Sequence, residues 1–234
     1  GIKWSDGAPL SSDDFLFTFN NIWLNTEYSP VPSRNVEGGR AVKVDDLTFY
    51  YEFDEPRPLM VNLLANYGDF FVDPVHYYKD FHPAFTDRET LKQRIADMGL
   101  LTWMAFYHAA KRQLIEESAQ VPTLAAHRVV SRTPTRVLLE RNPYYFKVDP
   151  AGQQLPYIDS IDSKQVDNKE VIAAMSSTGQ LDFSAYELKT QDIPLLKLGE
   201  RNGDIRVLVW NRLHSSDVVI QPNYNYDDAN LNAL

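Results

Sequence analysis

The sequence has 234 residues, 44% of them hydrophobic and 24% charged, and its 32 acidic and 23 basic side chains give a formal net charge of −9. Proteins that wrap nucleic acid carry clustered Lys and Arg, whereas the longest basic run here is the pair Lys111-Arg112, so a nucleic-acid partner is not expected. No apolar stretch is long enough to span a bilayer, and the absence of cysteine excludes disulfides, cysteine-based zinc sites, iron–sulfur clusters and thiol nucleophiles.

The chain begins with a predicted turn and a predicted helix. Asp6-Gly7 provides a position that tolerates a positive φ, and Pro9 cannot continue a strand. Ser11 and Asp14 approximate a capping box at the start of a helix. One apolar stripe at helical spacing follows, made of Phe15, Phe19, Ile22 and Trp23. A loop is expected from Asn25 to Gly39.

A strand and three further helical regions are expected next. Apolar and polar residues alternate from Leu47 to Asp54, the period of a half-buried strand. A short helix is expected over Leu59–Leu64. Thr86-Asp87-Arg88-Glu89 is a capping box whose helix ends at Gly99, and a second helical run extends from Leu100 to about Ser118.

After Pro122 the pattern changes to strands separated by turns. The expected strands are Arg136–Glu140, Ile158–Val166, Ile205–Trp210 and Val218–Gln221. A helix capped by Asp167 or Asn168 runs through Met175 and stops at Gly179, and a short helix is expected over Thr190–Leu198. Strands that alternate with helices predict an α/β sheet architecture.

The sequence contains no convincing catalytic set. The five histidines lack the spacing of a metal site, and the G-x-S-x-G, P-loop and dinucleotide-binding motifs are absent. Asp13-Asp14 is better explained by helix capping than by acid–base chemistry. No catalytic residue, metal site or cofactor is therefore expected. The aromatic and amide groups at Trp210 and over Asn223–Tyr226 suit a surface that binds a polar ligand, and a polar connecting loop explains them equally well.

Three motifs together resemble one family. The opening KWSDGAPLSSDDFLFTFNNI resembles the W-S-D-G-x-P segment of family 5 extracellular solute-binding proteins, the oligopeptide- and dipeptide-binding components of ABC importers. VLLERNPYYFKVDPAGQQLPYIDSI resembles their R-N-P-x-Y-W segment, and EVIAAMSSTGQLDFSAY resembles a helix followed by G-x-[IL]-D. The motifs stand in the family's order from Trp4 to Asp182. Phe146 replaces the usual Trp, and the family's G-T-G-P-Y is absent.

The resemblance implies a periplasmic-binding-protein-like fold of type II, cluster C. The chain would be most of lobe one, a mixed sheet with flanking helices, and the second lobe would be missing. Residues 1–122 would form the extra subdomain with a helical insertion, residues 123–221 part of the main sheet subdomain, and residues 222–234 the start of the crossover.

The resemblance also implies a function outside the cytoplasm. Two lobes would close on a solute, and ABC permease subunits in the membrane would recognise the closed form. The full-length protein would be periplasmic or held at the outer face of the cytoplasmic membrane by a lipid anchor. The captured ligand would be an oligopeptide or an oligosaccharide, with metal chelates also known in the family. The implied contact residues are Tyr67, Gly68, Phe183, Ser184, Ala185, Tyr186, Trp210, Asn211, Asn223, Tyr224 and Asn225.

Two alternatives belong to other functional classes. A secreted hydrolase with an unrecognised active site would place two carboxyl groups close together in a pocket and raise the pKa of one of them. A structural or adhesion module would expose a large apolar patch and associate with itself.

Overall fold

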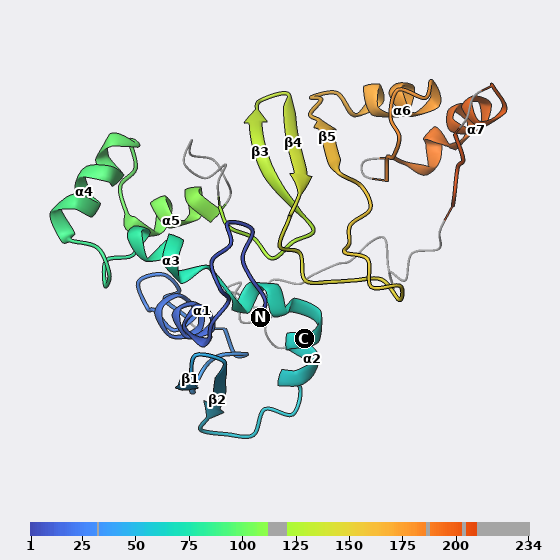
Figure 1. Cartoon of the computed structure of the whole chain (residues 1–234). Coiled ribbons are helices and arrows are strands. Elements are labelled where there is room, and N and C mark those ends of the chain that lie inside the picture. Colours follow the sequence, from blue (N-terminus) through green and yellow to red (C-terminus); the bar gives the residue numbers. More distant parts are fainter. Residues whose placement is uncertain (32, 112–120, 186–187, 203–204, 210–234) are drawn as a thin grey trace, which may run out of the picture. The chain divides into compact units, whose positions relative to one another are not determined.

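The computed structural model describes residues 1–31, 33–111, 121–185, 188–202 and 205–209. Helices, a two-stranded sheet and a three-stranded sheet account for its regular structure, which confirms the expected α/β composition (Figure 1). The chain falls into two compact units that divide between Gln165 and Val166. The expected subdomains 1–122, 123–221 and 222–234 stay predictions. None of the described helices is long and apolar enough to cross a bilayer.

The first helix begins where the sequence predicts and then changes its winding. α1 spans Ser12–Leu16 and continues as the π-helix η1 over Phe17–Trp23. The backbone N–H of Ser11 donates to Oδ2 of Asp14 at 2.9 Å, which confirms the capping role expected of this carboxylate.

η1 packs on a β-hairpin formed by β1 (Gly39–Asp45) and β2 (Thr48–Phe53), which pair antiparallel (Figure 1). β2 lies within the predicted strand, whereas β1 begins where the predicted loop ends. The ring of Phe19 lies 4.7 Å from that of Tyr51 and 6.1 Å from that of Phe53, measured between centroids. These contacts between η1 and β2 form the centre of one apolar core.

The predicted stripe faces this hairpin only in part. Phe19 and Ile22 are buried, and Phe15 and Trp23 are half-buried. The side-chain amide of Asn20 pairs with the backbone of Ala41 in both directions. Its Nδ2 donates to the carbonyl oxygen at 2.9 Å, and its Oδ1 accepts from the N–H at 3.0 Å. This pairing fixes η1 against β1.

Further short helices follow the hairpin. They are α2 (Met60–Tyr67), the 3-10 helix η2 (Gly68–Phe71), α3 (Val75–Tyr78), the 3-10 helix η3 (Lys79–Phe81), α4 (Arg88–Asp97) and α5 (Trp103–Lys111). Aromatic side chains from these helices and from η1 form a second core. Its largest buried members are Phe17, Tyr78, Phe81, Trp103, Phe106 and Tyr107.

The start of α4 differs by one residue from the predicted capping box. Asp87, not Thr86, is the N-cap, and its carboxylate accepts a hydrogen bond of 3.0 Å from the N–H of Thr90. Gly99 follows the helix with a φ of +66°, as expected of a residue that ends it. α5 confirms the second helical run as far as Lys111, and residues 112–118 of that run lie outside the described residues.

A three-stranded antiparallel sheet completes the first unit. β3 (His127–Thr133), β4 (Arg136–Arg141) and β5 (Ser160–Lys164) lie in that order (Figure 1). β4 and β5 confirm two predicted strands, although β5 is shorter than expected. β3 was not predicted, because its polar residues are exposed on both faces and hide the alternation of a strand.

The second unit contains α6 (Lys169–Ser177), the 3-10 helix η5 (Thr190–Asp192) and α7 (Ile193–Asn202). Asn168 caps α6 by accepting from the N–H of Glu170 at 2.8 Å, which selects one of the two predicted caps. The two α-helices cross closely at Gly199, where an added Cβ would lie 2.8 Å from the Cα of Ser177.

The predicted strand Ile205–Trp210 is wrong over the described residues 205–209, which have no regular secondary structure. The N–H of Val207 donates to Oε1 of Glu200 at 2.9 Å, and its carbonyl oxygen accepts from Nζ of Lys197 at 3.3 Å. The backbone of Val207 therefore pairs with side chains of α7 and not with a neighbouring strand. The predicted strand Val218–Gln221 lies outside the described residues.

Candidate ligand-binding site

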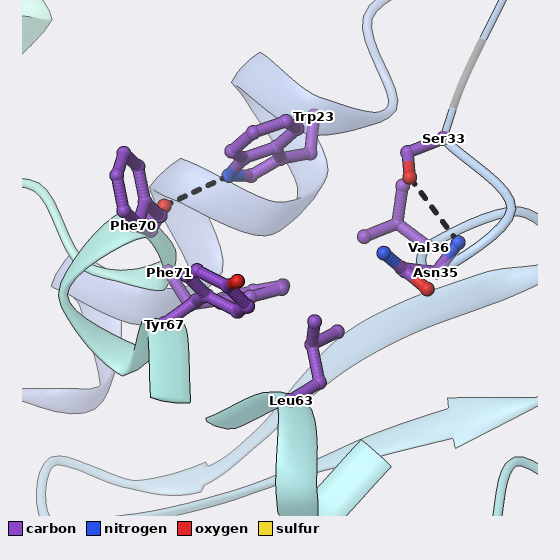
Figure 2. A pocket seen from close by; sticks show the side chains of 8 residues that line it. All are labelled: Trp23, Ser33, Asn35, Val36, Leu63, Tyr67, Phe70 and Phe71. Carbon is purple, nitrogen blue, oxygen red and sulfur yellow. Dashed lines mark hydrogen bonds between the residues drawn. The ribbon is translucent and has the colours of Figure 1, made fainter. Parts of the chain in front are cut away.

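A pocket of about 300 Å³ opens in the first unit beside the C-terminal end of α2 (Figure 2). It is formed by the end of η1, the loop that precedes β1, α2 and η2. The described residues that line it are Trp23, Ser33, Asn35, Val36, Leu63, Tyr67, Phe70 and Phe71. Four of these eight side chains are aromatic and none is charged.

Trp23 joins two walls of this pocket. Its indole Nε1 donates a hydrogen bond of 3.0 Å to the carbonyl oxygen of Phe70, shown as a dashed line in Figure 2. Its ring also stacks on that of Phe71, at 6.0 Å between centroids and 26° between planes. Because the indole N–H is already paired, Trp23 offers an aromatic surface and no free donor.

The loop before β1 closes the opposite side. Val36 is 1% exposed and supplies an apolar surface there. Ser33 holds the loop in shape, since its Oγ accepts from the N–H of Asn35 at 3.3 Å (Figure 2) and its carbonyl oxygen accepts from the N–H of Val36 at 2.9 Å. The hydroxyl and carbonyl oxygens of Ser33 therefore accept hydrogen bonds from within the loop.

Tyr67 is the predicted contact residue that lines this pocket. It is the last residue of α2, its side chain is 54% exposed, and its ring lies 6.2 Å from that of the equally exposed Phe70. The expected loop around Tyr67 and Gly68 is instead a junction of two helices, because the apolar pattern of α2 continues directly into η2. Gly68 has a φ of −60° and open space where a Cβ would stand.

The other predicted contact residues fall in two groups. Phe183, Ser184 and Ala185 belong to the second unit, in a segment without regular secondary structure. Phe183 is 84% exposed, Ser184 is half-buried and Ala185 is exposed. Outside the described residues lie Tyr186, Trp210, Asn211, Asn223, Tyr224 and Asn225.

Sequence reasoning missed most of the pocket. Trp23 was interpreted only as a core residue, and the aromatic pair Phe70-Phe71 was not considered. The signal for the pair was its place two residues after Gly68, close to the predicted contacts. Ser33, Asn35 and Val36 carried no such signal, since the fold alone brings their loop to the pocket.

Asp87, Asp149 and Asp162 each have a lowered pKa, whereas the hydrolase alternative requires a carboxyl group whose pKa is raised. Hydrogen bonding lowers the pKa of Asp87, of Asp149 and of Asp162, chiefly from Thr90, Tyr157 and Arg136 respectively. Asp149 accepts from the hydroxyl of Tyr157 at 2.6 Å and from the N–H groups of Ala151 and Gln153, each at 2.8 Å. Within the described part of the chain, no three His, Asp or Glu side chains are grouped to hold a metal ion.

A comparison with family models gives one match. The model described as bacterial extracellular solute-binding proteins, family 5 middle, covers residues 1–230. The chain is also 31% identical, over 169 residues, to the periplasmic alpha-galactoside-binding protein of Rhizobium meliloti strain 1021. That alignment covers 70% of this chain and 22% of the relative.

Solved structures of the same kind resemble the fold. The structure named oligopeptide-binding protein OppA has a TM-score of 0.81 and 33% identity, over 90% of this chain and 34% of that one. The periplasmic binding protein MelB of Agrobacterium fabrum C58, solved with stachyose, has a TM-score of 0.64 and 28% identity, over 84% of this chain and 28% of that one. These likenesses confirm the periplasmic-binding-protein-like fold. The chain spans about a fifth to a third of the length of these relatives.

Proposed function

The chain belongs to the bacterial extracellular solute-binding proteins of family 5, and from this premise we propose that it is part of the solute-binding component of an ABC importer. The protein that contains it captures an oligopeptide or an oligosaccharide outside the cytoplasm and delivers it to permease subunits in the membrane. The observation that carries this proposal is the family match over residues 1–230. The names of the relatives support both ligand classes.

The exposed aromatic side chains support a role in binding. Tyr67 and Phe183 are 54% and 84% exposed, so a ligand can reach both aromatic rings. We assign ligand contacts to Tyr67 and Gly68 in the first unit and to the segment after Asp182 in the second. The further contacts proposed from the sequence are Tyr186, Trp210, Asn211, Asn223, Tyr224 and Asn225.

The proposed activity is capture and release without chemical conversion of the solute. Two lobes close over the ligand by a hinge motion, and the closed form is the one that the permease recognises. A lipid anchor on the longer protein keeps it at the outer face of the cytoplasmic membrane. The relatives with binding names support capture in preference to catalysis.

Thermal unfolding of the full-length protein with peptide and oligosaccharide libraries tests this proposal. A ligand at about 100 times its dissociation constant adds roughly 2.7 kcal/mol of stability, which raises the melting temperature measurably. A selective rise with members of one library is the expected result. No rise with either library would contradict the proposal.

A pair of exposed variants tests the assigned contacts. Phe183→Ala removes a proposed contact, whereas Leu101→Ala removes a side chain that is 95% exposed and assigned no contact. Both variants should keep the melting temperature of the free protein, because neither side chain is buried. We expect only Phe183→Ala to reduce the rise that the selected ligand causes. Equal rises in both variants would remove Phe183 from the site.

A further inference from the structure

His82 joins the turn before α4 to the end of η1. Its side chain is buried, Nε2 lies 3.1 Å from the carbonyl oxygen of Asn21, and Nδ1 accepts from the N–H of Ala84 at 3.1 Å. We infer that His82 is an acid-sensitive clamp. Its neutral ring holds the last turn of η1, and binding of a proton releases that turn and, with it, Trp23 at the wall of the pocket. The inference concerns a regulatory device in the first unit and does not depend on which solute is captured.

The two contacts of the ring fix one protonation state. Because the N–H of Ala84 donates to Nδ1, that nitrogen carries a lone pair, and the ring proton is on Nε2, where it donates to the carbonyl oxygen of Asn21. A second proton would be placed on Nδ1 and would face the N–H of Ala84, one donor against another. The ring therefore cannot bind a proton and keep both contacts.

The surroundings of His82 favour the neutral ring. η1 has no ionisable side chain over Phe17–Trp23, and the rings of Phe17 and Trp103 lie 5.8 Å and 4.7 Å from the imidazole, measured between centroids. The charge of Glu27 favours the protonated form, but its Oε2 already accepts from Nε1 of Trp103 at 2.8 Å. Burial outweighs this charge and the hydrogen bond to η1, and it lowers the pKa of His82.

The ionisable residues of α5 have other partners. Tyr107 and Lys111 both contact the carboxylate of Asp73. His108 stacks on Tyr28, at 4.9 Å between ring centroids.

The charged residues of η3, of the turn that follows it and of α4 are exposed or paired. Those with exposed side chains are Lys79, Asp80, Asp87, Arg88, Glu89, Lys92 and Asp97. Arg94 is half-buried, and its guanidinium donates to the carbonyl oxygen of Asp80 at 2.8 Å and lies 4.9 Å from the centre of the Phe81 ring. Burial and Glu27 are therefore the main influences on the proton affinity of His82.

Proton binding has a direct consequence for the turn before α4. Pro83, Ala84 and Phe85 are exposed, so the charged ring reaches water on this side once its contact with Ala84 breaks. A buried charge without a partner is strongly unfavourable, which favours opening of the turn over retention of the ring in its place.

Release of the ring affects the pocket through η1. The last carbonyl groups of a helix have no partner within it, and His82 supplies the donor for the carbonyl group of Asn21. Trp23 follows two residues later, and its indole donates to the carbonyl oxygen of Phe70 at 3.0 Å (Figure 2). Loss of the His82 contact therefore loosens the end of the helix that places this indole at the pocket wall.

A pH titration of the ¹⁵N-labelled protein from pH 7.5 to pH 4.5, followed by NMR, tests the clamp. The reporters are the imidazole of His82, the backbone N–H of Ala84 and the indole N–H of Trp23, the last assigned by its absence in Trp23→Phe. We expect all three to change with one common midpoint, below the ordinary histidine pKa of about 6.5. The described residues that line the pocket include no Asp, Glu or His, so the pocket itself supplies no group that would shift the Trp23 signal in this range.

Two histidine variants separate the clamp from other titrating groups. His82→Asn offers Ala84 an amide oxygen in place of Nδ1 and binds no proton in this range, so it should abolish the changes at Ala84 and Trp23. His76→Asn removes a histidine that is about one-third exposed and lies 2.7 Å from Oδ2 of Asp6. This control should keep both changes and their midpoint. If His82→Asn does not fold, the common midpoint in the unmodified protein still decides the question.

Several results would overturn the inference. They are an Ala84 signal that does not follow the imidazole, a Trp23 signal with another midpoint or none, and an unchanged Trp23 titration in His82→Asn. A His82 imidazole with a midpoint above about 6.5 would also contradict it, because the folded chain would then bind the proton more tightly than the unfolded one.

Discussion

The indole Nε1 of Trp4 donates a hydrogen bond of 3.3 Å to Oδ2 of Asp14, and both side chains are almost completely buried. The same carboxylate accepts from the N–H of Ser11 at 2.9 Å and, through Oδ1, from the N–H of Val75 at 2.9 Å. One carboxylate thus joins the opening turn, the start of α1 and the start of α3. Trp4 of the W-S-D-G segment and Asp14 of the helix that follows it therefore have a structural role.

Replacement of Asp14 should destabilise the first unit strongly. Asp14→Asn leaves one carbonyl oxygen for three donors and turns an NH₂ group toward at least one of them. We expect a loss of about 2–4 kcal/mol in the free energy of unfolding, because hydrogen bonds to a buried charged group are worth about 1.5–3 kcal/mol each. Urea denaturation followed by tryptophan fluorescence measures this loss.

Asp13 provides the matched control for this prediction. Its carboxylate is half exposed and pairs with Nζ of Lys43 at 2.8 Å. Surface ion pairs contribute about 0–1 kcal/mol, so Asp13→Asn should change the free energy of unfolding by no more than that. Equal losses in the two variants would mean that the buried contacts of Asp14 are not what stabilises the turn.

Gly199 and Gly68 differ in the space that surrounds an added side chain. Gly199 lies against the backbone of Ser177, so Gly199→Ala forces α6 and α7 apart and should cost about 1–3 kcal/mol of stability in the second unit. Gly68 has ordinary helical dihedral angles and no atom within 4 Å of an added Cβ. Gly68→Ala should therefore be neutral or stabilise by about 0.4–1 kcal/mol, through the unfolded chain.

Hydrogen exchange and thermal unfolding of both glycine variants check this pair. Faster amide exchange in α6 and α7 is expected for Gly199→Ala alone. If Gly68→Ala were as destabilising as Gly199→Ala, the junction between α2 and η2 would differ from the one described.

The fold was predictable wherever periodic burial dominates. The helical spacing of the apolar residues from Phe15 to Trp23 predicted the first helix, because two of the four, Phe19 and Trp23, pack into the same core. β1 was missed because Ala41 is its one buried residue and charged residues surround it. The predicted strand Ile205–Trp210 is wrong over the described residues 205–209, because a strand also requires a neighbour with which to pair.

The site was less predictable than the fold. Tyr67 was identified from the family resemblance, and it does line the pocket. Trp23, Val36 and Leu63 come from three separate segments, and only the packing of η1 and α2 brings them together. No local sequence pattern predicts that these three residues lie together. The residues from Trp210 onward stay predictions, because they lie outside the described part of the chain.

His82 should make the stability of the first unit depend on pH. The imidazole is buried, Nε2 lies 3.1 Å from the carbonyl oxygen of Asn21, and Nδ1 accepts from the N–H of Ala84 at 3.1 Å. Burial lowers the pKa of His82, against smaller opposing effects of Asn21 and Glu27. The folded state therefore holds the neutral ring at pH values where the unfolded chain already binds a proton.

The sign of the effect follows from linkage. Below the ordinary histidine pKa of about 6.5 the unfolded state binds more protons, so the free energy of unfolding falls as the pH decreases. One group contributes a slope of at most about 1.4 kcal/mol per pH unit, which ends once the pH is below the folded pKa. Urea titrations between pH 7.5 and 5 should show this slope in the unmodified chain and a smaller one in His82→Asn. An unchanged slope in the variant would assign the pH dependence to other groups.

Asp73 connects the segment before α3 to α5 through two partners. Its buried carboxylate accepts from the hydroxyl of Tyr107 at 2.9 Å, and its Oδ1 lies 2.8 Å from Nζ of Lys111. Burial, reinforced by the charge of Asp73, raises the pKa of Tyr107 well above its ordinary value and that of Tyr28 to about 12. Tyr107 is thus held as a neutral donor to this carboxylate, and the Tyr28 hydroxyl also stays neutral.

Removal of the Lys111 ammonium group should lower the free energy of unfolding more than removal of the Tyr107 hydroxyl. Lys111→Met leaves a buried carboxylate without its counter-ion, whereas Tyr107→Phe leaves the ion pair in place. Since Lys111 is about one-third exposed, we expect a loss of about 2–3 kcal/mol for Lys111→Met, below the 3–5 kcal/mol of a fully buried pair. Tyr107→Phe should lose about 1–2 kcal/mol. Urea denaturation of both single variants and of the double variant measures these values, and because the two donors share one acceptor their effects should not add. Strict additivity would show that Lys111 and Tyr107 act independently of a common carboxylate.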